Sequence, residues 1–71
     1  MTRHHVASSS LRSVAYAEAS RVLEIEFVTG AIYRYLEVPH QAYDALLAAA
    51  SKGRHFNREI RNRFNYTRLT P

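Results

Sequence analysis

The sequence of 71 residues contains no cysteine and only two glycines and two prolines. The absence of cysteine excludes disulfide bonds, thiolate metal sites and thiol nucleophiles, and it is typical of small domains in a reducing compartment. No apolar run approaches the roughly 20 residues that cross a bilayer. The segment Met1–His5 also lacks the apolar core of a signal peptide. The sequence therefore predicts a single cytoplasmic domain.

Positive charge is concentrated at the C-terminal end of the chain. The formal net charge is +4. Residues 1–51 carry four arginines against five acidic residues, a balance of −1, whereas residues 52–71 carry six basic residues against one acidic residue, a balance of +5. A basic cluster of this kind attracts phosphate-rich partners, but a solvated face that aids solubility has the same composition. Both interpretations stay open at this level.

The N-terminal residues show little pattern. Residues 1–9 have no hydrophobic period and run into serines, which predicts a flexible tail ahead of one domain over residues 10–71. Residues 11–16 alternate weakly and predict a first strand, with a turn over residues 17–20.

A β-hairpin is the clearest local feature. Residues 21–28 alternate between apolar and acidic side chains, which is the period of a half-buried strand. Thr29-Gly30 marks a turn, and residues 31–38, rich in β-branched and aromatic side chains, form the return strand. Pro39 cannot donate to a sheet ladder and ends that strand. The apolar face of the first strand consists of Leu23, Ile25 and Phe27.

The length of the hairpin loop decides which face of the return strand is buried. A two-residue loop would place Arg34 opposite Ile25. A three-residue loop with Gly30 in a left-handed conformation places Tyr33 opposite Ile25 and Arg34 opposite Glu24. The second register pairs apolar side chains on one face of the sheet and opposite charges on the other face, so we expect it.

Two helices are predicted after the hairpin. From His40 the apolar period changes to that of a helix, and Gly53 stands where a left-handed helix terminator is expected. Residues 65–69 are either a frayed tail or a last short strand. The fold class is therefore α+β, a three-stranded antiparallel meander packed against two C-terminal helices. The two apolar helical stripes are Tyr43, Leu46, Leu47 and Ala50, and Phe56, Ile60 and Phe64.

Several of these residues together form a more specific pattern. Its parts are Leu23–Phe27, Gly30, Tyr33–Tyr35, Val38-Pro39, Ser51–Gly53, Phe56-Asn57 and Ile60-Arg61. Over approximately residues 9–68 this pattern resembles the KTSC domain, a module at the C-terminal end of some lysyl-tRNA synthetases that also occurs as free-standing small bacterial proteins. The family is uncharacterised, and RNA binding is a suggestion that rests on the fusion to a synthetase.

The junction of the predicted helices is a candidate phosphate site. Free backbone N–H groups at a helix start, with the positive end of its dipole, attract anions. Gly53 would let a phosphate approach the backbone, and Lys52 and Arg54 would add charge. A plain capping glycine between solvated neighbours is the alternative interpretation.

The second candidate is a row of arginines. Arg54, Arg58 and Arg61 are spaced by four and three residues, so they can follow one side of a helix. Uncompensated like charges at that spacing destabilise a helix, which favours a partner anion over a merely soluble face. Glu59 can relieve part of this repulsion by pairing with Arg63, and Arg68 lies nearby in the sequence.

Aromatic and histidine side chains are further candidates for binding and catalysis. On an exposed sheet face Tyr33 and Tyr35 could stack on bases, but in the expected register they belong to the core. Tyr66, amid the arginines, is the better candidate for stacking on a base. The histidines lack the spacing of a metal site. His55 next to Arg54 could act as the base of a small ribonuclease.

The sequence thus favours an RNA-binding or polyanion-binding module of weak sequence specificity, without enzymatic activity, cofactor or metal. The partner we expect is tRNA-like or single-stranded RNA. One alternative is a protein-interaction module, which could be a homodimer, and a minor alternative is a small basic ribonuclease. The predicted phosphate-contacting and RNA-contacting residues are Lys52, Gly53, Arg54, Arg58, Arg61, Arg63 and Tyr66.

Overall fold

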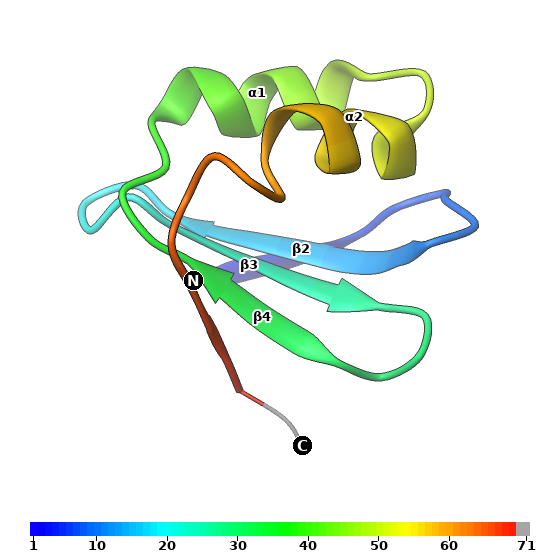
Figure 1. Cartoon of the computed structure of the whole chain (residues 1–71), viewed down its shortest axis with the longest axis horizontal. Coiled ribbons are helices and arrows are strands. Elements are labelled where there is room, and N and C mark those ends of the chain that lie inside the picture. The colour runs from blue at the N-terminus through cyan, green and yellow to red at the C-terminus, as the bar shows by residue number, and fades with distance from the viewer. Residues whose placement is uncertain (70–71) are drawn as a thin grey trace.

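The computed structural model describes residues 1–69, and that range contains five strands and two helices. The strands form one antiparallel sheet in the order β1-β2-β3-β4-β5, and both helices lie over the same face of it (Figure 1). The α+β class is confirmed, whereas the predicted number of three strands is wrong. In chain order the elements are β1 (Thr2–His5), β2 (Leu11–Ala17), β3 (Val22–Phe27), β4 (Ile32–Tyr35), α1 (His40–Ala48), α2 (Lys52–Glu59) and β5 (Tyr66–Arg68).

The two additional strands are the outer strands of the sheet. The expectation that residues 1–9 lack regular structure is wrong for β1, which pairs with β2 over four residues. All side chains of β1 are exposed, so no hydrophobic period marks it in the sequence. Backbone pairing and an ion pair from Arg3 to Glu24 hold it instead. β5, one of the two alternatives for residues 65–69, pairs with β4 and is also exposed.

The register of the central hairpin is as predicted. Tyr33 lies opposite Ile25, and Arg34 lies opposite Glu24. The loop between the paired ends has three residues, and Gly30 adopts a φ of 96° there, a conformation that favours glycine. This register points Tyr33 toward the helices and Arg34 to the opposite face of the sheet.

The helices are shorter than their apolar stripes suggest. α1 ends at Ala48, and the extended backbone of Ala49 leaves Ala50 outside it. Gly53 lies inside α2, so the prediction that it terminates the first helix is wrong. A Cβ at this position would lie 3.1 Å from Ser10 Oγ. The glycine therefore allows α2 to approach the loop between β1 and β2.

The core lies between the sheet and the two helices. On the other face of the sheet Glu24 is only 8% exposed and forms ion pairs with Arg3 and with Arg34. The Arg34 Nη2 atom lies 3.0 Å from Glu24 Oε2. Neither helix within residues 1–69 is long and apolar enough to span a membrane. The buried hydrophobic core comprises Leu11, Val14, Leu23, Ile25, Tyr35, Val38, Tyr43, Leu46, Phe56 and Ile60.

Candidate nucleic-acid interface

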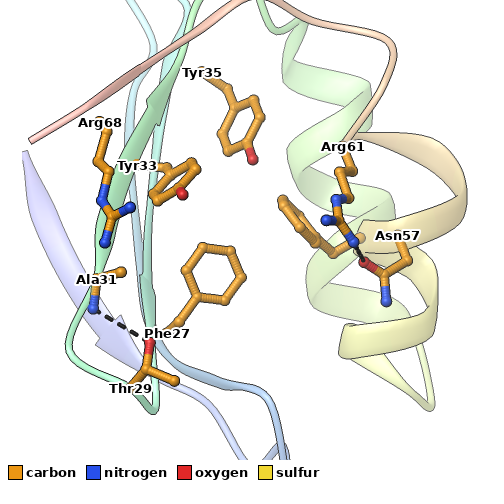
Figure 2. A pocket seen from close by; sticks show the side chains of 9 residues that line it. Phe27, Thr29, Ala31, Tyr33, Tyr35, Asn57, Arg61 and Arg68 are labelled. Atoms are coloured by element: carbon orange, nitrogen blue, oxygen red, sulfur yellow. Dashed lines mark hydrogen bonds between the residues drawn. The ribbon is translucent and has the colours of Figure 1, made fainter.

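An aromatic groove opens between the hairpin of β3 and β4 and the helix α2 (Figure 2). Its volume is about 320 Å³, which is at the lower end of the range for small-ligand sites. Tyr33 and Tyr35 point from the sheet toward α2, and Arg61 and Asn57 lie across the groove from them, joined by a hydrogen bond. None of the described residues that line the groove is acidic. They are Phe27, Thr29, Ala31, Tyr33, Tyr35, Phe56, Asn57, Arg61 and Arg68.

Ring contacts hold the aromatic wall of the groove in place. Phe27 meets Tyr33 and Phe56 edge to face, with centroid separations of 5.6 and 5.3 Å. Tyr35 meets Phe56 in the same way at 5.5 Å. These geometries are the preferred ones for aromatic pairs. Because Tyr35 and Phe56 are buried, the wall is part of the core and is preorganised.

β5 extends this wall beyond the area that the helices cover. Its pairing with β4 sets Tyr66 opposite Tyr35 and Arg68 opposite Tyr33. Tyr66 is 54% exposed and stacks on Tyr33, with centroids 5.1 Å apart. The Arg68 guanidinium carbon lies 5.5 Å from the centre of the Tyr33 ring. The short last strand therefore brings a cation, Arg68, to the groove and stacks an exposed ring, Tyr66, on the groove residue Tyr33.

Two arginines from different elements reach the groove. Arg61 follows α2, and its Nη1 lies 3.5 Å from Asn57 Oδ1. Arg68 comes from β5, on the other side of the opening (Figure 2). Two guanidinium groups beside an aromatic wall can attract an anion that also carries a flat ring.

The phenol of Tyr35 has a pKa above that of a free phenol. Burial raises the pKa of Tyr35 to about 12, and the neighbouring Tyr33 and Tyr66 add to the shift, while Arg61 acts in the opposite direction. Tyr35 therefore offers a neutral hydroxyl to the groove throughout the neutral pH range.

The family of the protein follows from a match that covers most of the chain. The model of the KTSC domain matches residues 7–64. The chain belongs to the KTSC domain family. A KTSC domain protein of Yersinia pestis has the same fold, with a TM-score of 0.94, 36% sequence identity and coverage of 97% of each chain.

Relatives of two kinds share this KTSC domain. An uncharacterized protein of Stutzerimonas stutzeri is 46% identical over 70 residues, which are 97% of this chain and 99% of that protein. A lysine–tRNA ligase of Nostoc punctiforme is 36% identical over 62 residues, which are 87% of this chain but only 11% of the ligase. The domain therefore occurs both as most of a small protein and as a minor part of a tRNA ligase.

At the helix junction, where a phosphate site was predicted, several groups already make contacts within the KTSC domain. Lys52 Nζ donates to the Ala49 carbonyl at 3.1 Å. Ser51 caps α2 and accepts from the Arg54 backbone N–H at 3.4 Å. Gly53 faces Ser10 across a tight contact. A role for Lys52, Gly53 and Arg54 in phosphate binding stays a prediction.

The remaining predicted arginines lie on the exposed surface around the end of α2. Arg58 and Arg63 have side chains that are 68% and 65% exposed. Both pair with Glu59, Arg58 through Nε at 3.1 Å and Arg63 through Nη2 at the longer distance of 3.8 Å. One carboxylate thus serves two cations, and exposed pairs of this type are weak.

Sequence reasoning missed the groove itself. Tyr35 is core, as expected, but Tyr33 is only half-buried and lines the groove. Asn57 and Phe27 were not candidates. The period-2 spacing of Tyr66 and Arg68 was the available signal, because it places both side chains on the face of the sheet that carries Tyr33.

The histidines form no evident metal centre. Within the described part of the chain no group of three or more His, Asp or Glu side chains is placed to hold a metal ion. His40 Nδ1 lies 2.8 Å from Asp44 Oδ2 at the start of α1, away from the groove residues. His55 is half-buried on α2.

Proposed function

We propose that this KTSC domain is an RNA-binding module that contacts phosphates through the basic surface at the end of α2. The observation that carries the proposal is the charge balance of that surface. Arg54, Arg58, Arg61 and Arg63 are all exposed, and the one acidic residue of this stretch, Glu59, pairs only with Arg58 and Arg63 among them. Neutralising phosphates with such side chains releases counterions, which favours binding without sequence readout.

Two further observations support RNA as the polyanion. The aromatic groove lies beside Arg61, and aromatic side chains next to cations are typical of single-stranded nucleic-acid sites. A related domain is also part of a lysine–tRNA ligase. A tRNA or a single-stranded RNA is therefore the first partner to test, and a cytoplasmic location is the matching expectation.

The test is fluorescence anisotropy of labelled tRNA and of a single-stranded RNA, titrated with protein over a series of salt concentrations. We expect binding that weakens steeply with salt. The double variant Arg58→Glu/Arg63→Glu should bind more weakly. If both arginines contact phosphates, its salt slope should be smaller by about 1.4, at roughly 0.7 per phosphate contact on a single strand.

The matched control is Arg12→Glu/Arg21→Glu, which changes the net charge equally but lies outside the C-terminal cluster. It should retain most of the wild-type affinity. An equal loss in both double variants would show that net charge alone attracts the RNA. No binding at low salt would contradict the proposal.

A protein-interaction module, including a homodimer, is the second candidate. It is favoured by the exposed outer strands β1 and β5, since strands at the edge of a sheet can pair with another chain. A mass that rises with concentration in sedimentation, together with no affinity for RNA, would favour this candidate over RNA binding.

The proposal also treats the domain as a binding module without catalysis. RNA that stays at full length after long incubation with the protein agrees with it. Cleavage that disappears in the His55→Ala variant would instead establish the ribonuclease alternative.

A further inference from the structure

The aromatic groove differs chemically from the rest of the basic surface. Arg58 and Arg63 stand on an open surface and can meet any phosphate. Arg61 and Arg68 border a hollow of about 320 Å³ whose wall includes Phe27, Tyr33 and Phe56. A hollow of this size admits one small ring system and its substituents and is too small for a folded RNA element.

The wall of the groove suits a flat aromatic group. Phe27 and Phe56 provide apolar surface, and the ring contacts of Tyr33 and Tyr35 fix their positions. Figure 2 shows the hydroxyls of both tyrosines directed toward α2, where Asn57 stands. Phenol and amide groups can donate to and accept from the edge of a base.

The two cations beside this wall suit an anion attached to the ring. Arg61, just after α2, and Arg68, in β5, approach the groove from different segments, and no acidic side chain lies among the described lining residues. Guanidinium groups bind phosphate oxygens through charge-assisted hydrogen bonds. A flat ring joined to a phosphate is the chemistry of a nucleotide.

We propose that the groove holds one unstacked nucleotide of the bound RNA, with its base against Phe27, Tyr33 and Phe56 and its phosphate at Arg61 and Arg68. This inference rests on the proposed RNA binding and adds the site of a single base to it. Tyr66, exposed and stacked on Tyr33, is placed to receive the next base of an unpaired strand. The domain should therefore prefer RNA with unpaired bases over a fully paired duplex.

The experiment titrates the full chain with adenosine 5′-monophosphate, adenosine and inorganic phosphate, each followed by NMR chemical shifts. We expect saturable shifts at the groove residues with the monophosphate and weaker binding of the other two probes. The variant Arg61→Gln/Arg68→Gln should lower the affinity for the monophosphate by roughly tenfold or more, through the loss of charge-assisted bonds. Both side chains belong to exposed residues, and circular dichroism checks that the variant folds.

The matched control is Arg12→Gln/Arg21→Gln, which removes the same charge outside both the groove and the basic surface at the end of α2. It should bind the monophosphate as the wild type does. A 2-aminopurine base within a single-stranded RNA then reports stacking, and its fluorescence should be quenched by the wild type but much less by Tyr33→Leu/Tyr66→Leu.

The outcomes separate the two proposals. Salt-dependent RNA binding with no monophosphate shifts in the groove and no 2-aminopurine quenching would overturn the base site while leaving the basic surface intact. Monophosphate binding in the groove without any RNA binding would overturn the RNA module and identify a site for free nucleotides. Equal effects of the two arginine variants on the monophosphate would also overturn the groove as the site.

Discussion

Tyr35 shows what burial does to a single side chain. It is 2% exposed, and its ring contacts Tyr33, Phe56 and Tyr66. This burial raises the pKa of the phenol to about 12. The same side chain thus supports the core and presents a neutral hydroxyl to the groove. The folded protein holds the proton of Tyr35 more tightly than the unfolded chain does, so ionisation of this phenol at high pH opposes folding.

The free energy of unfolding should fall as pH rises from 10 toward 12. Below pH 10 the Tyr35 phenol is protonated in the folded and unfolded states. Above pH 10 it ionises in the unfolded chain but keeps its proton in the folded protein, so ionisation favours unfolding. Burial also raises the pKa of Tyr16 and of Tyr43, which adds to the loss. Urea denaturation at a series of pH values measures it.

The variant Tyr35→Phe isolates the contribution of this residue. It should show a shallower loss of stability above pH 10, because one raised phenol is missing. Between pH 7 and 9 the difference between variant and wild type should be constant, which serves as the internal control. Parallel curves over the whole range would contradict the assignment to Tyr35.

At the scale of elements, the position of α2 is set by close approach. Gly53 lies within the first turn of the helix, where an alanine would have a better helix propensity. A Cβ there would lie 3.1 Å from Ser10 Oγ and 3.3 Å from Ser10 Cβ. The close contact with the β1–β2 loop thus favours glycine at position 53, although helix propensity favours alanine.

We expect Gly53→Ala to behave differently in two backgrounds. In the wild type the tight contact should offset the gain in helix propensity, which is about 1 kcal/mol at most. In the Ser10→Gly background, where the obstructing side chain is absent, the same substitution should be more favourable. A double-mutant cycle by urea denaturation measures the coupling. Additive effects would show that the contact does not limit the approach of α2.

At the scale of the whole molecule, β1 protects the sheet. The strand order places β1 beside β2, a seven-residue strand with a largely buried face. Without β1 the unpaired backbone groups of β2 would form the edge of the sheet, and long edge strands pair with other chains. The exposed side chains of β1 bury little apolar surface, so β1 stabilises the fold through backbone hydrogen bonds and the Arg3–Glu24 ion pair.

Deletion of residues 1–5 should therefore lower the free energy of unfolding by about 2 kcal/mol. The deletion removes several backbone hydrogen bonds, and each contributes roughly 0.5–1.5 kcal/mol to stability. It should also cause concentration-dependent association, measured by sedimentation. The control His4→Ala/His5→Ala keeps the backbone pairing and should behave as the wild type. A deletion variant that stays monomeric and fully stable would contradict this role of β1.

Much of the fold was predictable because local patterns specify it. Alternation fixed β3, and the three-residue loop at Gly30 fixed the pairing of Tyr33 with Ile25, since both faces of the hairpin had to be satisfied. β1 could not be predicted in this way, because its stability comes from pairing with β2 and not from its own side chains. Gly53 was misinterpreted for a similar reason, since its contact with Ser10 joins segments far apart in the sequence.

The amino-acid sequence alone specified the family, the α+β class, the central hairpin and the excess of positive charge at the C-terminal end. The family follows from the resemblance of an ordered set of motifs to a known domain, whereas the other three properties depend on composition and on short-range periodicity, which are local. It took the folded chain to reveal that Lys52 turns to the Ala49 carbonyl, and that Arg61 and Arg68 meet at one aromatic groove. The groove needs β5 beside β4 and Phe56 of α2 against Phe27 of β3. The period-2 spacing of Tyr66 and Arg68 predicts that they share a face, but no local pattern specifies which strand β5 joins, because that pairing links segments far apart in the sequence.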